Sequence, residues 1–413
     1  MTNPKYEWIV VGGGINGIAI AEILCRNGHK VLLLEKNSKL ASETTKEFHE
    51  WFHTGALYSL VPDKFATARY LLGAIDDLLR YYSGFVRMNL RVAANGLSIY
   101  GNGWFNDEYI LYKYKNRKLN SAWMYSIAKS VCFIETLGSH DWLRRNAGGD
   151  ELIGRIKMQS ILQKMLSVYK ENTEYFEVDS PDFTINSRKL LSDLLNMASI
   201  QGLEVQCNNK VEKVIELDQK VKVQTQNGEF EGENIVFCSP DLISYLFGEN
   251  IKHGYAPMGI YEGVSDSQSS FVNLDFNTRN CINLLRKENG YGLAGGITLN
   301  DRKDVKDYFN FVHTEHLKLN PQMKLIETYI GIKKEIKNDR FSRNYLYHIN
   351  RKSKRQWTAL LGKFTLFSSL APEFYRRVYL KNSKRAEELK KQTDMKKLVA
   401  PTNWAEITHS EEF

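Results

Sequence analysis

The sequence has few cysteines and no long apolar run. Its five cysteines, among 413 residues, include no C-x-x-C pair, so neither a disulfide framework nor a zinc site is indicated. No stretch reaches the roughly 18 consecutive apolar residues that span a bilayer, and MTNPKYEWIVV lacks the features of a secretory signal. We therefore expect a cytoplasmic protein with no membrane span and no bound metal ion.

Motifs for binding nucleic acid are also missing. The net charge of +8 is spread along the chain, which favours an anionic small-molecule substrate over nucleic acid. The basic segment Arg376 to Lys397 has helical spacing, and it could touch anionic lipid at a membrane surface or lie in solvent. Glu387 and Glu388 interrupt the basic residues, which favours a solvated helix.

The length and the N-terminal pattern predict a two-domain α/β protein. A chain of 413 residues is too long for one compact core. Tyr6 to Val11 is a short apolar run, Ile15 to Asn27 has helical spacing, and Lys30 to Glu35 is a second apolar run that ends in an acid. This order predicts a strand-helix-strand unit.

A glycine pattern lies in the first turn of that unit. Gly12, Gly14 and Gly17 form G-x-G-x-x-G between the strand and the helix. Gly12 permits a tight turn, Gly14 lets a pyrophosphate approach the backbone, and Gly17 lets the helix pack closely on the strand. Glu35 ends the second strand, where a carboxylate can accept hydrogen bonds from the ribose of adenosine. The pattern predicts that the chain binds FAD or NAD.

The segment after Glu35 favours FAD. LASETTKEFHEWFHTGALYSL resembles the segment after the ribose-binding acid in FAD-dependent glycerol-3-phosphate dehydrogenases and, more loosely, in the D-amino-acid-oxidase-like superfamily. YIGIKKEI, FSRNYL and LLGKFTLFSSLAPEF resemble three later blocks of that family, in the same order. The matching residues of the first segment are Ser42, Thr44, Thr45, His53, Gly55 and Tyr58.

The resemblance implies a set of cofactor contacts. The backbone of Val211 would meet the adenine, and the turn 362–365 would open a helix whose N-terminus stabilises negative charge on the reduced flavin. Hydroxyl groups at Thr44 and Thr45 can bond phosphate or ribityl oxygens. The residues expected to bind FAD are Gly12, Gly14, Ile15, Asn16, Gly17, Glu35, Lys36, Ser42, Thr44, Thr45, Val211, Gly362, Lys363, Phe364 and Thr365.

Several positions depart from the family pattern. Leu57 stands where members that bind a phosphorylated substrate carry arginine, and Lys333-Lys334 replaces an Arg-Pro pair. A lysine offers a point charge where arginine offers a planar fork, so we do not expect glycerol 3-phosphate itself to be the substrate. The departures are Glu50, Thr54, Leu57, Ser239, Lys333 and Lys334, whereas Arg343 is kept.

The expected chemistry is removal of hydride from a carbon that bears a hydroxyl or, less favoured, an amine. His53 is the expected base, because the ordinary pKa of histidine lies near neutrality and its segment should run beside the flavin. His49 is a second polar contact or a covalent attachment point. Arg343, Lys333 and Lys363 are expected to bind an anionic group of the substrate. A flavin monooxygenase and an inactive FAD-binding partner subunit stay open, and the electron acceptor is unassigned.

The remaining patterns divide the chain between two domains. Helices are predicted over Lys64–Tyr82, Ser121–Arg145, Ile156–Tyr169 and Asn186–Ile200, with hairpins over Ala93–Lys115 and three strands from Lys210 to Pro240. We expect a discontinuous Rossmann-like FAD-binding domain from residues 1–90, 181–255 and 329–413. Residues 91–180 and 256–328 should form an α+β substrate domain around an antiparallel sheet.

Overall fold

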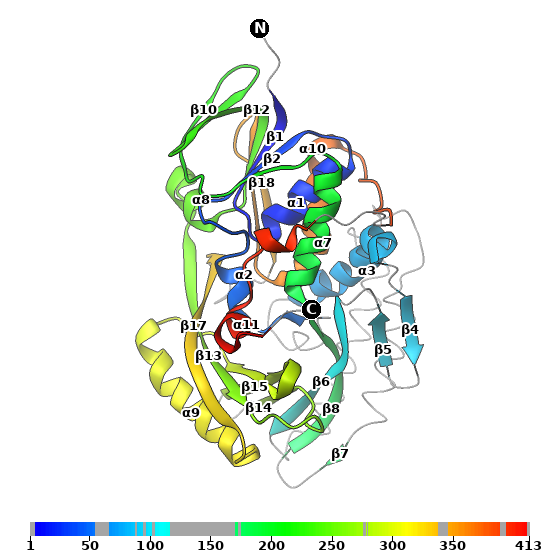
Figure 1. The fold of residues 1–413 in the computed structure, drawn as a ribbon, viewed down its shortest axis with the longest axis vertical. Helices are drawn as coiled ribbons and strands as arrows, with labels where there is room; N and C mark the ends of the chain where they lie inside the picture. The colour runs from blue at the N-terminus through cyan, green and yellow to red at the C-terminus, as the bar shows by residue number, and fades with distance from the viewer. Residues whose placement is uncertain are drawn as a thin grey trace.

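Two large sheets, the helices packed on them and a separate two-stranded hairpin make up the described part of the chain, seen in the computed structural model of Figure 1. The sheets lie toward opposite ends of the long axis of the molecule. The residues described are 5–53, 66–86, 89–93, 96–100, 104–115, 170–171, 175–275, 278, 280–337, 346–388 and 394–410.

The first sheet is parallel at its centre. Strand β2, with the sequence VLLL, is buried throughout, as expected of a strand covered on both faces. Strand β1 lies between β2 and β12, with Trp8 level with both Val31 and Asn234. In spatial order the strands are β10 (Val211–Glu216), β11 (Val221–Thr225), β12 (Gly228–Phe237), β1 (Tyr6–Val11), β2 (Val31–Leu34) and β9 (Glu204–Gln206); β19 (Gln356–Leu361) runs parallel to β12, and β18 (Tyr347–Arg351) pairs with β19.

The second sheet is mainly antiparallel. Its strands β14 and β6 form a parallel pair, and helix α9 packs on β13, β15 and β16. A short separate hairpin joins β4 (Asn89–Ala93) and β5 (Gly96–Tyr100). In spatial order the strands are β17 (Lys324–Ile336), β13 (Ile251–Glu262), β16 (Gly292–Gly296), β15 (Asn280–Arg286), β14 (Phe271–Asp275), β6 (Phe105–Lys115), β8 (Tyr175–Ile185) and β3 (Trp51–Phe52), and β7 (Lys170–Glu171) pairs with β8.

Helix α1 is the centre of the packing around the first sheet. Every residue of it is buried, because α7 and α10 both pack against it. Within the described residues, each helix is too short or too polar to cross a bilayer. The helices are α1 (Ile15–Arg26), α2 (Thr44–Glu47), α3 (Ala66–Val86), α7 (Ser187–Ile200), α8 (Pro240–Phe247), α9 (Val305–Leu319), α10 (Phe367–Tyr379) and α11 (Asn403–Thr408), with 3-10 turns η3 (Glu288–Gly290), η4 (Arg302–Asp304), η5 (Phe364–Leu366) and η6 (Lys396–Leu398).

The structure confirms the predicted α/β fold class, with its Rossmann-like parallel sheet and its separate antiparallel sheet. The N-terminal strand-helix-strand unit is also as predicted, and β10, β11 and β12 are the three strands predicted from Lys210 to Pro240. Asn186 caps α7, since its side chain accepts a hydrogen bond from the Lys189 N–H at 3.0 Å. The helices predicted over 121–145 and 156–169 lie outside the described residues. Two predicted domain boundaries fall within the long strands β13 and β17, and the division itself stays a prediction.

The prediction of one helix over Arg376–Lys397 is wrong. Helix α10 ends at Tyr379, and Leu380 takes the left-handed conformation that terminates it. The described residues that follow run as an irregular segment, with the Ala386 N–H donating to the Tyr81 carbonyl at 2.8 Å. Tertiary hydrogen bonds to α1 and α3 therefore replace the helical ones here.

Candidate active site

A cavity of about 850 Å³ is lined by residues of both sheets. Its size falls within the range of about 300–1,000 Å³ that is usual for cofactor and ligand sites. It contains the glycine turn at the end of β1, the residues after β2, the segment 41–53 and the turn before α10. Thirteen of the residues predicted to bind FAD line it: Gly12, Gly14, Ile15, Asn16, Glu35, Lys36, Ser42, Thr44, Thr45, Val211, Gly362, Lys363 and Phe364.

The glycine turn has the geometry of a phosphate cradle. Gly12 has a φ of +109°, and a side chain at Gly17 would place its Cβ 1.8 Å from the Gly12 carbonyl oxygen. Gly14 is the N-cap of α1 and has no side chain of its own to cap the helix. The first N–H groups of a helix and its dipole attract anions. The turn therefore fits the pyrophosphate of a dinucleotide.

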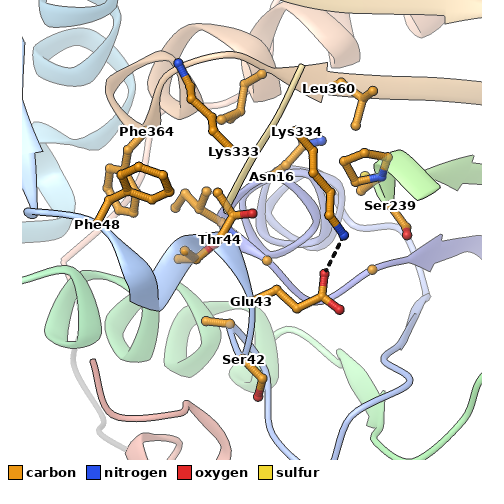
Figure 2. A pocket seen from close by; sticks show the side chains of 18 of the residues that line it. Asn16, Ser42, Glu43, Thr44, Phe48, Ser239, Lys333, Lys334, Leu360 and Phe364 are labelled. Carbon is orange, nitrogen blue, oxygen red and sulfur yellow. Dashed lines mark hydrogen bonds and ion pairs between the residues drawn. The ribbon is translucent and has the colours of Figure 1, made fainter. Parts of the chain in front are cut away.

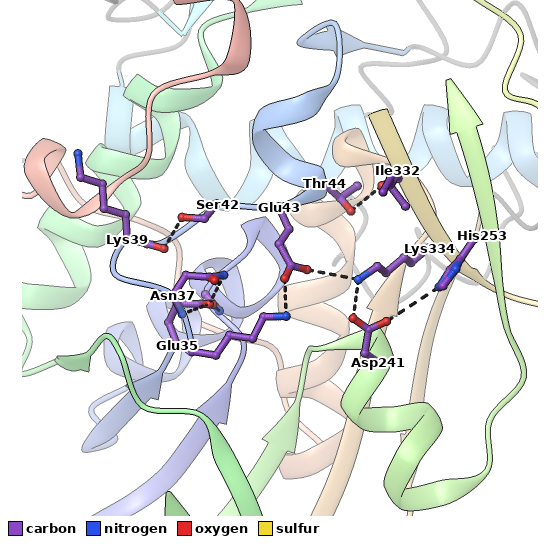
Figure 3. A network of polar contacts seen from close by, with 12 residues as sticks. Glu35, Asn37, Lys39, Ser42, Glu43, Thr44, Asp241, His253, Ile332 and Lys334 are labelled. Atoms are coloured by element: carbon purple, nitrogen blue, oxygen red, sulfur yellow. Dashed lines mark hydrogen bonds and ion pairs between the residues drawn. The ribbon is translucent and has the colours of Figure 1, made fainter. Parts of the chain in front are cut away.

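Glu35 is held in the position expected of a ribose ligand. It is buried, and it accepts hydrogen bonds from the Gly13 N–H at 2.7 Å and from both nitrogens of Asn37 at 2.8 Å. Figure 3 shows Glu35 and Asn37 side by side. A carboxylate can accept about four hydrogen bonds, so the three found here leave room for a ribose hydroxyl.

The segment after β2 is fastened to β17 by a polar network (Figures 2 and 3). Lys334 lies 3.4 Å from Glu43 and 2.5 Å from Asp241, and Glu43 also pairs with Lys36. Asp241 in turn lies 4.0 Å from His253. Lys334 replaces a proline of the family pattern. Its ion pairs link β17 to the segment after β2 and to α8 at the cavity.

The hydroxyl groups predicted for the cofactor already have protein partners. Thr44 donates to the Ile332 carbonyl at 2.8 Å, and Ser42 donates to the Lys39 carbonyl at 2.7 Å. Thr45 accepts from the Ile15 N–H at 3.3 Å. The side-chain oxygens of these residues can still accept hydrogen bonds, but the hydroxyl hydrogens of Ser42 and Thr44 point to the backbone.

His53 lies between the buried Asp182 and Lys363, and both His53 and Lys363 line the cavity. Nδ1 of His53 lies 3.2 Å from Asp182, and Nε2 lies 3.4 Å from Nζ of Lys363. Trp51 donates its indole N–H to the same Asp182 oxygen at 2.9 Å, and its ring lies 4.2 Å from the His53 ring. The predicted contact Thr365 is fully buried and accepts from the His53 N–H at 2.9 Å, so it holds His53 in place.

The pKa of His53 differs from the value assumed in the sequence-based prediction. Burial and the charge of Lys363 lower this pKa to about 4, although Asp182 acts in the opposite direction. The ring is therefore neutral at pH 7, with a lone pair that can accept a proton. The prediction that its pKa lies near neutrality is wrong, because that reasoning took no account of burial or of the neighbouring cations.

A second set of charges lies at the wall of the cavity, which His49 and Glu50 line. Lys287 and Glu50 form an ion pair at 2.5 Å, with side chains only 5% and 6% exposed. Glu50 also accepts hydrogen bonds from both the N–H and the hydroxyl of Ser187, and from the Trp404 indole at 3.1 Å. Burial, assisted by the charge of Lys287, lowers the pKa of His49 to about 3. Glu50 thus replaces the basic residue of the family pattern, and Lys287, in the loop after β15, supplies a cation beside it.

The predicted anion-binding residues are only partly brought together. Lys333 lines the cavity and pairs with Glu335, and Figure 2 shows its side chain directed away from Lys334. Lys363 lines the cavity beside His53. Arg343 lies outside the described residues, as do Thr54, Gly55, Leu57 and Tyr58.

Sequence reasoning missed Asp182 and Lys287. Asp182 is 129 residues from His53, and Lys287 is 237 residues from Glu50. No local motif marks either residue, since a single acid in a strand or a single lysine in a loop is common. The one available signal was Glu50, an acid where the family pattern has a basic residue. A buried carboxylate needs a cation or several hydrogen-bond donors nearby, so a distant cation could be expected.

Comparison with solved structures gives a consistent fold over almost the whole chain. L-α-glycerophosphate oxidase from Mycoplasma pneumoniae, with FAD bound, has a TM-score of 0.63 and 15% identity over 94% of this chain and 97% of its own. L-proline dehydrogenase from P. horikoshii has a TM-score of 0.61 and 12% identity over 93% and 96%. Glycine oxidase from Bacillus cereus has a TM-score of 0.56 and 14% identity over 91% and 95%.

Comparison by sequence identifies the family. No curated protein matches the chain. A family model described as FAD dependent oxidoreductase matches residues 7–253, which include the glycine turn, Glu35 and His53. With that match and the dinucleotide cradle in place, the chain belongs to the family of FAD-dependent oxidoreductases.

Proposed function

We propose that this enzyme oxidises the carbon next to a hydroxyl group in a small anionic substrate, such as a hydroxy acid or a sugar derivative. FAD, when bound, supplies the acceptor for the hydride that leaves this carbon. The protein has to bind the substrate, orient it and remove the hydroxyl proton. The observation that carries the proposal is the neutral, buried His53 ring, held between Asp182 and the cavity lysine Lys363.

The position of His53 supports its role as the base. With Nδ1 directed to the Asp182 carboxylate, the lone pair of the ring is on Nε2, 3.4 Å from Nζ of Lys363, and the substrate hydroxyl would replace that lysine contact. As the substrate carbon loses hydride, its O–H bond breaks, the proton passes to Nε2 and a carbonyl forms. Asp182 can then stabilise the positive imidazolium, as a buried carboxylate does in other histidine-dependent enzymes.

The charges around the cavity support an anionic substrate. Burial is the main cause of the lowered pKa values of His49 and His53, and the charges of Lys287 and Lys363 add to it, so cations lie close to both rings. A positive potential attracts carboxylate or phosphate groups and opposes a protonated amine. The lysines therefore favour an alcohol over an amine. Two of the similar structures are named for amino acids, but at 12–14% identity they share the fold alone.

Substrate binding should also strengthen the base. A substrate anion next to Lys363 would offset the charge that lowers the pKa of His53. The ring would then have a higher proton affinity when substrate is bound than when the cavity is empty. The lysine and the histidine would work as a pair, one recognising the anion and the other taking the proton.

Anaerobic reduction of the bound flavin tests the proposal. The purified holoenzyme is mixed with lactate, malate, glycerate, sugar acids and amino acids, and the visible spectrum is followed. We expect a hydroxy acid or a sugar derivative to bleach the flavin. Bleaching by amino acids alone would refute the alcohol chemistry, bleaching by NADH alone would favour a monooxygenase, and no reduction by any compound would favour an inactive subunit.

We also propose that the protein resides in the reducing cytoplasm. None of the four cysteines within the described residues forms a disulfide: Cys25, Cys207, Cys238 and Cys281. Burial raises the pKa of the thiols of Cys25, Cys207 and Cys238, which disfavours the reactive thiolate.

A further inference from the structure

We infer that Asp182 is a positioning residue that fixes the tautomer of His53, with the ring proton on Nδ1 and the lone pair on Nε2. The inference rests on the proposed function, in which His53 is the base. Asp182 is fully buried, and its carboxylate lies 3.2 Å from Nδ1 of His53. No sequence motif marks it, and its role follows from the contacts that the fold creates.

The sheet brings the two residues together. Strand β3 pairs antiparallel with β8, so Trp51 lies opposite Thr184 and Phe52 lies opposite Phe183. His53 follows Phe52 directly, and Asp182 precedes Phe183 directly. The register therefore sets Asp182 beside His53, and a one-residue slip would turn the carboxylate to the other face of the sheet.

The chemistry of the partners decides where the ring proton lies. An ionised carboxylate can only accept hydrogen bonds, so the nitrogen facing Asp182 must carry the hydrogen. The nitrogen facing Lys363 must then be the acceptor, since a lysine ammonium can only donate. The pKa of about 4 keeps the ring in this single-proton form near pH 7. Both neighbours thus select the same tautomer.

Trp51 and Thr365 hold the pair in place. The Trp51 indole donates to the same Asp182 oxygen at 2.9 Å, and its ring packs against His53. The Thr365 hydroxyl accepts from the His53 N–H. With both the ring and the carboxylate fixed, little reorganisation is needed when the imidazolium forms.

The substitution Asp182→Asn tests the inference with two readouts. An asparagine amide can donate to Nδ1, which would move the ring proton to Nε2 and remove the lone pair from the cavity. The tautomer is read from two-bond ¹H–¹⁵N NMR spectra of holoenzyme labelled with ¹⁵N-histidine, and His53→Gln assigns the signal. We expect Nδ1–H in the wild type and a shift toward Nε2–H in the variant. Flavin reduction by the most active hydroxy acid should slow by a factor on the order of 10²–10⁴.

Asp193→Asn is a matched control. Asp193 is also buried, and it accepts hydrogen bonds from the Trp104 indole N–H at 2.8 Å and from Nζ of Lys189 at 3.0 Å. This variant should retain the His53 tautomer and the reduction rate. Equal effects of Asp182→Asn and Asp193→Asn on both readouts would overturn the inference, because a general loss of packing would explain them.

The two readouts separate the inference from the proposed function. A wild-type His53 that carries its proton on Nε2 overturns the inference, and this measurement needs no variant that folds. A tautomer that responds to Asp182→Asn while reduction is unchanged supports the positioning role but refutes His53 as the base. Slow reduction in His53→Gln, with neither readout altered in Asp182→Asn, supports the base and overturns the inference.

Discussion

Removing one partner of the buried ion pair between Glu50 and Lys287 should lower the free energy of unfolding more than replacing both partners. We consider the change Lys287→Met, which removes the cation and leaves the carboxylate 6% exposed. Breaking a buried pair from one side costs about 3–5 kcal/mol. Glu50 keeps three further donors from Ser187 and Trp404, so we expect about 3 kcal/mol, the lower end of that range.

A double-mutant cycle measures this cost. The free energy of unfolding is obtained from urea titrations followed by circular dichroism for the wild type, Lys287→Met, Glu50→Gln and the double variant. The double variant should be more stable than Lys287→Met, because the Glu50→Gln change removes the unpaired buried charge. An exposed pair, Lys324 with Glu262, serves as control, and Lys324→Met should leave the midpoint unchanged. Additive effects in the cycle, or a cost for Lys287→Met below about 1 kcal/mol, would refute the reasoning.

Three further predictions concern the cofactor and the pH. Gly17→Ala places a methyl group against the Gly12 carbonyl, so the variant should be purified largely without flavin, which the absorbance ratio at visible and ultraviolet wavelengths measures. Glu35→Ala leaves the Gly13 N–H without its acceptor and should weaken FAD binding by about 10-fold or more in a fluorescence titration; unchanged affinity would count against the ribose contact. The pKa values of His49 and His53 are lowered on folding, to about 3 and about 4, so the unfolded state takes up their protons first as the pH falls. Stability should therefore be complete above about pH 6.5 and fall toward pH 4, by on the order of 3 kcal/mol for each ring, and melting curves of His53→Gln should show a weaker pH dependence.

The N-terminal nucleotide-binding unit could be predicted from the sequence because its signals are local. The glycines, the apolar runs on either side and the acid at the end of β2 all lie within one short stretch, so spacing alone gives the strand, the turn and the helix. The Asn186 cap of α7 is local in the same way. At Gly17 any side chain would collide with the Gly12 carbonyl, so this position of the turn requires glycine.

The segment after Tyr379 shows where local reasoning fails. Its basic residues have helical spacing, but the backbone of Lys384 bonds to Arg26 and Asn27 of α1 instead. Spacing predicts which residues could share a helix face. It does not indicate that backbone N–H and carbonyl groups of the segment will form hydrogen bonds to side chains at the end of α1.

The sequence by itself determined that the chain has a parallel nucleotide-binding sheet with a glycine turn and that a flavin is its expected cofactor. Only the tertiary structure decided which charges meet. Asp182 lies beside His53 because β3 pairs with β8, and Lys287 reaches Glu50 from the loop after β15. The pKa of His53 depends on burial and on Lys363, which are properties of the folded molecule. Contacts between residues more than a hundred positions apart leave no spacing pattern, so the chemistry of the site had to come from the fold.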